Sequence, residues 1–351
     1  DAFDSAEVDN GYAVQVSQKI PWCGKRSARG RQARAEANAA YHDLQDSRLR
    51  LDEMTRTSFY DYYLTRRQLE LNRENLEVLR QFSETAKSKY AVNQVTQQDV
   101  LQAEVELMEL ERRNIELERM GKVSAARINT LLRQDPFWPL AAPPQELEFP
   151  NYELDAELLQ HFATTQRPDL AAAAARLRAA QAAVTLASKE YYPDTEVFGK
   201  YDAFWQEQPL QTAVGVNLNV PIYRDRLRAA VCEARFTLSQ RRSEYHQLVL
   251  DIRYEVAEAY EQAEESRRVW QLYTDKLVPT AEQNVAAARS NYDVNKASFL
   301  DLAIAQRQLV ELREKREEAL TQYHSRMAEL TRAVGGTIPT VLGEEMPMPA
   351  L

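Results

Sequence analysis

The chain has 351 residues, of which 44% are hydrophobic and 28% are charged, with only 9 Gly and 14 Pro. Because Gly usually makes up about 7% of a protein, tight turns should be few and long helices should dominate. The net charge of −9, with Lys and Arg interleaved among Asp and Glu, excludes the basic stripe that a nucleic-acid partner requires. No stretch approaches the ~18 apolar residues of a membrane-spanning helix, so any membrane crossing would have to be made by strands.

The first predicted elements are a strand and a very long helix. Residues 12–20 alternate apolar and polar side chains, which is typical of a half-buried strand. After Pro21 a helical pattern covers roughly residues 25–89, and a helix of about 65 residues is ~100 Å long. A turn follows, and a second helix returns to about Arg133.

The middle of the chain is predicted to hold a linker, short helices and two strands. Residues 135–167 are rich in proline and contain a short helical pattern near 157–163. An Ala-rich helix over 168–188 begins with Pro and Asp, a common start signal. Alternating residues then predict strands over 195–205 and 214–220, joined by a hairpin.

The last part repeats the plan of the first. A long helix is predicted over roughly 224–291, with Pro279 inside it, followed by a turn and a helix that returns to about Val334. Pro-rich residues 337–351 read as an extended tail.

An internal duplication relates the two halves, residues 1–134 and 168–336. Tyr90 and Tyr292 are separated by 202 residues, and the apolar positions of the return helices keep that separation. Pro21 and Pro221, each placed between a strand and a long helix, are separated by 200 residues. The sequence therefore predicts a mainly α fold of long antiparallel hairpins, with a small β part.

The strand patterns suggest one apolar and one small polar face. The side chains that we expect to face lipid are Val14, Val16, Val214, Val216, Leu218 and Val220. Those expected to face a water-filled lumen are Gly215, Asn217 and Asn219. Such alternation is typical of membrane strands, although a strand packed on a soluble core would show it too. The nearby Tyr201, Phe204 and Trp205 suit either an interfacial aromatic girdle or ordinary cross-strand packing.

The two predicted turns share a motif with two interpretations. Thr96 with Asp99, and Ser298 with Asp301, have the spacing of a capping box at a helix start. A ring of these aspartates at the mouth of a tunnel is the alternative.

No catalytic, metal or cofactor site is predicted. Cys23 and Cys232 form no CxxC pair, and we expect both thiols to stay unpaired. The histidines are scattered, and no nucleophile, base or phosphate-binding loop is evident. The chain is therefore not expected to be an enzyme.

The order of several motifs along the chain resembles the TolC family of outer-membrane efflux proteins. The motifs are Gln18-Lys-Ile-Pro-Trp-Cys-Gly-Lys-Arg26, Arg167-Pro-Asp-Leu170, Tyr191-Tyr-Pro193, Val256-x-x-Ala259-Tyr260, Tyr292-x-x-Asn295-x-x-Ser298 and Leu330-x-x-Ala333-x-Gly335-Gly336. The resemblance implies a homotrimer that forms a shared outer-membrane β-barrel and a periplasmic α-barrel tunnel. It also implies a periplasmic adaptor and an inner-membrane pump as partners, and lipid around the strands. The segment after Pro21 looks most like members that serve heavy-metal pumps of the resistance-nodulation-division type. Relative to the family, a helix and a strand are expected to be missing before residue 12.

The two turns are expected to be periplasmic tips that contact the adaptor. The residues assigned to this contact are Tyr90, Asn93, Gln94, Thr96, Tyr292, Asn295, Lys296 and Ser298. Asn at the turn tolerates the left-handed backbone conformation. The competing hypothesis is a soluble coiled-coil scaffold without a pore, which would leave the strands without a purpose.

Overall fold

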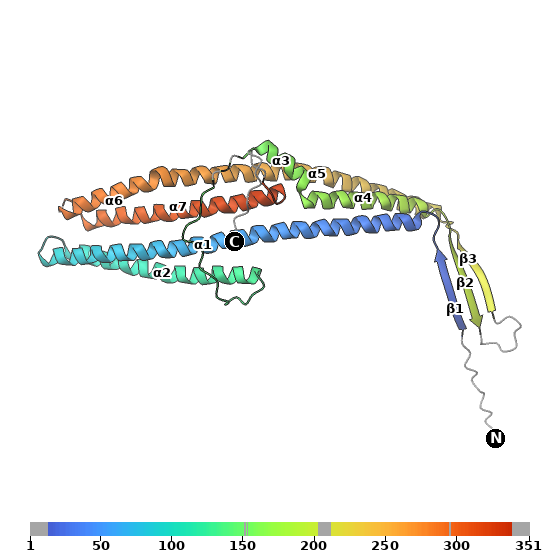
Figure 1. Ribbon diagram of the computed structural model, residues 1–351, viewed down its shortest axis with the longest axis horizontal. Helices are drawn as coiled ribbons and strands as arrows, with labels where there is room; N and C mark the ends of the chain where they lie inside the picture. Colours follow the sequence, from blue (N-terminus) through green and yellow to red (C-terminus); the bar gives the residue numbers. More distant parts are fainter. Residues whose placement is uncertain (1–12, 151, 153, 203–211, 295, 339–351) are drawn as a thin grey trace, which may run out of the picture. The chain divides into compact units, whose positions relative to one another are not determined.

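The computed structural model describes residues 13–150, 152, 154–202, 212–294 and 296–338. Its strands are β1 (Ala13–Ile20), β2 (Asp194–Asp202) and β3 (Thr212–Asn219). Its α-helices are α1 (Lys25–Ala91), α2 (Gln97–Leu131), α3 (Ala156–Gln166), α4 (Pro168–Lys189), α5 (Arg224–Leu272), α6 (Val278–Asp293) and α7 (Phe299–Val334) (Figure 1). A π-helical turn, η1 (Tyr273–Leu277), joins α5 to α6.

The predicted helices are confirmed, with one difference. The long helix expected over residues 224–291 is two α-helices joined by η1. Pro279, in the first turn of α6, has no N–H to donate to the carbonyl four residues earlier, at Asp275. Instead, the N–H of Val278 bonds to the carbonyl of Tyr273, five residues back, so the chain stays helical in a wider turn.

The described residues form two compact units. Among these residues, the first unit contains 13–44 and those between 168 and 249, and the second contains those between 45 and 167 and between 250 and 338. In the first unit, the strands form one antiparallel sheet in the order β1-β2-β3. Beside it, α4 and the start of α1 are linked by an ion pair between Arg176 and Asp43 at 2.5 Å.

The second unit consists mainly of two helical hairpins, α1 with α2 and α6 with α7 (Figure 1). Their tips pack together in one apolar cluster, made of Leu79, Phe82, Ala86, Ala103, Tyr292, Phe299, Leu302 and Ala303. Farther along, the buried amide of Gln306 on α7 donates to Asn75 on α1 at 3.0 Å. The two hairpins therefore share one core although they are far apart in the sequence.

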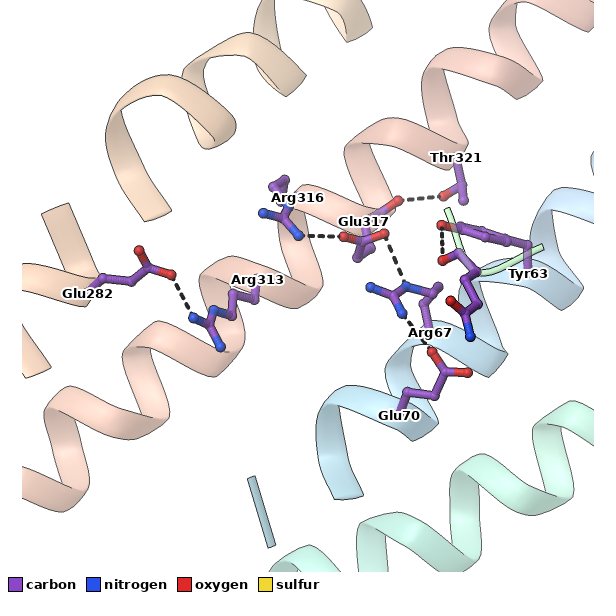
Figure 2. Close-up of polar contacts among 9 residues, drawn as sticks. Tyr63, Arg67, Glu70, Glu282, Arg313, Arg316, Glu317 and Thr321 are labelled. Carbon is purple, nitrogen blue, oxygen red and sulfur yellow. Dashed lines mark hydrogen bonds and ion pairs between the residues drawn. The ribbon is translucent and has the colours of Figure 1, made fainter. Parts of the chain in front are cut away.

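A buried carboxylate on α7 is paired with arginine side chains within this hairpin packing (Figure 2). The side chain of Glu317 is only 6% exposed and lies 2.8 Å from the guanidinium of Arg316 and 3.7 Å from that of Arg67 on α1. Arg67 also pairs with Glu70 at 2.6 Å. Because a buried charge is tolerated only when it is paired, these contacts explain how Glu317 can lie between helices.

Within the described part of the chain, no helix is both long and apolar enough to pass through a membrane.

Candidate functional site

The register of the sheet places the predicted apolar residues of β1 and β3 on one face, and Val220 directly follows β3. Val14 pairs with Tyr201 and Val16 with Gly199, while Gly199 pairs with Val214 and Val197 with Val216. Residues directly opposite each other in a ladder share a face. The six residues predicted to face lipid are between 54% and 85% exposed, so they do not belong to a core formed by the described residues.

The opposite face carries Gly215, Asn217 and Asn219. Gly215 pairs with Phe198, and a Cβ atom at position 215 would lie 2.6 Å from the tip of the Phe198 ring. The glycine therefore leaves room for a cross-strand aromatic ring. Asn217 and Asn219 are exposed, as side chains in contact with water would be.

A buried lysine holds the point where the sheet meets the helices. Lys25 is 2% exposed, and its ammonium donates to Asp194 Oδ1 at 2.8 Å and to the carbonyl of Tyr192 at 2.9 Å. It also lies 3.2 Å from Glu190. The backbone N–H of Trp22 donates to the same Asp194 oxygen at 2.9 Å. One ammonium group thus ties the start of α1 to the start of β2.

The two hairpin tips use the same hydrogen bonds, again 202 residues apart. The N–H of Gln94 donates to the carbonyl of Lys89 at 2.9 Å, and the N–H of Lys296 donates to that of Asn291 at 2.8 Å. Asn93 has φ +56°, which confirms the left-handed turn predicted there. Its counterpart Asn295 lies outside the described residues.

Both predicted capping boxes are present. Thr96 Oγ1 accepts from the N–H of Asp99, whose carboxylate accepts from the N–H of Thr96 at 3.0 Å. Ser298 and Asp301 make the same pair of bonds, the second at 2.9 Å. Hydrogen bonds from the hydroxyl and the backbone N–H of Ser298 hold the pKa of Asp301 below its usual value. The alternative hypothesis of an aspartate ring remains a prediction.

The two matched tyrosines have different environments. Tyr90 is 44% exposed, whereas Tyr292 is 2% exposed inside the tip cluster. Lys89 Nζ donates to the carbonyl of Tyr292 at 2.6 Å and lies 4.2 Å from the center of its ring. Burial raises the pKa of the Tyr292 hydroxyl. The side chain of Tyr292 is therefore packed between the two hairpins, and the adaptor contact expected for the tip residues stays a prediction.

Several expected features lie outside the described residues, and the two cysteines and the acidic and histidine side chains form no special site among the described ones. Phe204, Trp205 and the hairpin after them, as well as residues 339–351, lie outside the described residues. Cys23 and Cys232 are both exposed free thiols. Among the described residues, no group of three His, Cys, Asp or Glu side chains could hold a metal ion.

Sequence reasoning missed the Lys25 junction and a set of side-chain contacts between the linker and the helices. Tyr323 donates to the carbonyl of Pro150 at 3.1 Å, and Asn129 donates to that of Trp138 at 2.8 Å. Phe149 stacks on Trp270, with ring centers 3.9 Å apart. The sequence feature that could have indicated the Lys25 junction is a Lys directly after Gly24 at the start of a helix. No sequence pattern indicated which helices the linker contacts.

The chain is similar to known outer-membrane proteins. Residues 159–336 match the family described as outer membrane efflux protein. Over 339 residues the chain is 24% identical to the cobalt-zinc-cadmium resistance protein CzcC of Cupriavidus metallidurans, covering 95% of this chain and 79% of that protein. The outer-membrane channel OprN is similar with a TM-score of 0.80 and 20% identity, covering 92% of this chain and 74% of OprN. For VceC of Vibrio cholerae the TM-score is 0.78 and the identity 17%, over 93% of this chain and 87% of VceC. These two structures share the fold of this chain.

Proposed function

Because the chain belongs to the outer membrane efflux protein family, we propose that three copies of it assemble into a single duct. Within the membrane, the strands form the wall of this duct. The protein forms the outer-membrane exit duct of an efflux system and extends into the periplasm. It works with a periplasmic adaptor and an inner-membrane pump, and it belongs to a transport family.

The observation that carries the proposal is the sheet with two unlike faces. Its apolar face suits lipid and its Gly and Asn face suits a water-filled lumen. An Arg on the lipid face at mid-membrane should cost about 2–4 kcal/mol, and one on the lumen face much less. Val216→Arg should therefore lower the amount of trimer assembled in outer membranes, whereas the neighboring Asn217→Arg should not. Equal assembly of both variants would contradict the lipid assignment.

An exposed face on α2 supports assembly with further copies. Leu101 and Ile115 are 53% and 69% exposed. At the repeat distance of 202 residues they correspond to Ala303 and Glu317 on α7, which are 4% and 5% exposed against the other hairpin. The first copy of the hairpin thus leaves open the face that the second copy buries. In a ring of hairpins, the neighboring chain would cover this exposed face of α2.

This assembly can be tested by a charge on that face. Ile115→Glu should convert the detergent-solubilized trimer to smaller species in light scattering. Leu132→Glu is the matched control, because Leu132 is 50% exposed just after α2. If both variants remain trimeric, the α2 face is not the interface.

We propose further that the exposed tip residues Gln94 and Lys296 contact the adaptor. Both side chains are exposed, and only their backbone N–H groups are used in the turns. The variants Gln94→Cys and Lys296→Cys should crosslink to the cognate adaptor. Asp135→Cys, in the linker, is the matched control. Crosslinking at position 135 alone would contradict this docking surface.

The proposed cargo is divalent metal cations delivered by a resistance-nodulation-division pump. The name of CzcC and its similarity over 95% of this chain support this class. A strain that lacks the gene should lose tolerance to cobalt, zinc or cadmium and regain it with the intact chain. Sensitivity to organic toxicants alone would contradict the metal assignment.

A further inference from the structure

An exposed aromatic pair lies at the helix end of the sheet. The rings of Trp22 and Tyr192 are stacked, with centers 5.2 Å apart and planes 7° from parallel. The two residues are 42% and 44% exposed. Each thus has one side packed against its partner and a large part open to its surroundings.

The pair is held rigidly although it is exposed. The N–H of Trp22 and the ammonium of Lys25 both donate to Asp194, and Lys25 also donates to the carbonyl of Tyr192. Both backbones of the pair are therefore anchored to the same buried ion pair. Lys189 Nζ lies 5.5 Å from the center of the Tyr192 ring, which places a positive charge beside the aromatic surface.

The position of the pair along the strands matches the thickness of a membrane. Tyr201, paired with Val14, lies at the far end of the apolar face. From Val14 to Trp22, two residues beyond the end of β1, the chain counts nine residues, and a membrane crossing by a strand takes ~9–11. At ~3.3 Å per residue and a tilt of ~40°, this distance corresponds to ~20 Å along the membrane normal, close to the ~25 Å apolar band of known barrels.

We propose that Trp22 and Tyr192 lie among the phospholipid headgroups of the periplasmic leaflet and set the depth at which the strands stop. This inference rests on the membrane insertion proposed above. Trp and Tyr favor this region because their rings are apolar and their N–H and O–H groups can still reach water. Lys189 supplies a cation for the lipid phosphates, and the exposed Ile20 and Val220 continue the apolar face up to this level.

Depth-dependent fluorescence quenching tests the proposal in the assembled trimer. A chain with Trp138→Phe, Trp205→Phe and Trp270→Phe retains Trp22 alone. It is reconstituted into vesicles of phosphatidylethanolamine and phosphatidylglycerol that carry nitroxides at the headgroup, at a shallow or at a deep chain position. The fractional loss of Trp22 fluorescence should be largest with the headgroup or shallow label and smallest with the deep label.

A second probe separates this inference from membrane insertion itself. In a chain that also carries Trp22→Phe, Val216→Trp places a fluorophore in the middle of the apolar face, where the deep label should quench most. If Val216→Trp is quenched while Trp22 resists every label, the strands are inserted and Trp22 faces water or a neighboring copy, so the proposal is wrong. Strongest quenching of Trp22 by the deep label would also overturn it. If neither position is quenched, the insertion itself fails.

Discussion

Replacing Lys25 by Met should destabilize the junction between the sheet and the helices. The change removes an ammonium that lies 2.8 Å from Asp194, 2.9 Å from the carbonyl of Tyr192 and 3.2 Å from Glu190, while a long apolar side chain remains. Breaking a buried ion pair costs about 3–5 kcal/mol because one charge is left uncompensated. Glu190 is 39% exposed and can regain water, so we expect the lower end, a loss of about 3 kcal/mol in the free energy of unfolding.

Arg29→Met is the matched control for this prediction. Arg29 pairs with the same Glu190 at 3.3 Å but is 53% exposed, and exposed pairs contribute only about 0–1 kcal/mol. Guanidinium unfolding of the detergent-solubilized protein, followed by Trp fluorescence, would compare the two variants. Adding Asp194→Asn to Lys25→Met should recover part of the loss by removing the uncompensated charge. If Lys25→Met lost no more unfolding free energy than Arg29→Met, the reasoning would be refuted.

Three further predictions concern the tips, the second unit and the thiols. Thr96→Ala and Ser298→Ala should each cost about 0.5–2 kcal/mol through lost capping, measured by unfolding, and no loss would mean that the caps are dispensable. Burial lowers the pKa of His324 from 6.5 to about 4, so between these pH values the unfolded chain binds a proton that the folded chain does not, and stability should fall as pH is lowered through this window. His324→Phe should flatten that part of a stability profile against pH, and an unchanged profile would contradict it. Thiol titration under denaturing, non-reducing conditions should find two free thiols, Cys23 and Cys232. If no free thiol were found, the two cysteines would be joined in a disulfide and the prediction would be wrong.

Local patterns predicted most of the fold because each depends on near neighbors. The alternation at residues 214–220 predicted β3, and the spacing of Ser298 and Asp301 predicted a cap with the observed bonds. The start of α1 at Lys25 was also predicted. These features need only the residues beside them, so one sequence is sufficient to find them.

Contacts between distant segments could not be predicted in the same way. Tyr90 and Tyr292 occupy equivalent places in the repeat, yet only Tyr292 is buried, because burial depends on which neighbor covers each tip. Lys25 and Asp194 are separated by 169 residues, and no periodicity connects them. The strand faces and adaptor contacts likewise involve lipid or another protein, so sequence pattern alone leaves them as proposals.

The π-helical turn η1 has a consequence for how the two copies of the repeat diverged. From Pro21 to Tyr90 the chain counts 69 steps, and from Pro221 to Tyr292 it counts 71. An inserted residue in an α-helix would rotate everything beyond it by ~100°, turning buried side chains outward. The π turn closes its hydrogen-bonded ring with one residue more than an α turn. It can therefore take up one of the two additional residues, and beyond it Val278 and Ala281 still meet Leu309. An ancestral insertion could thus persist without changing which side of the helix faces its partner.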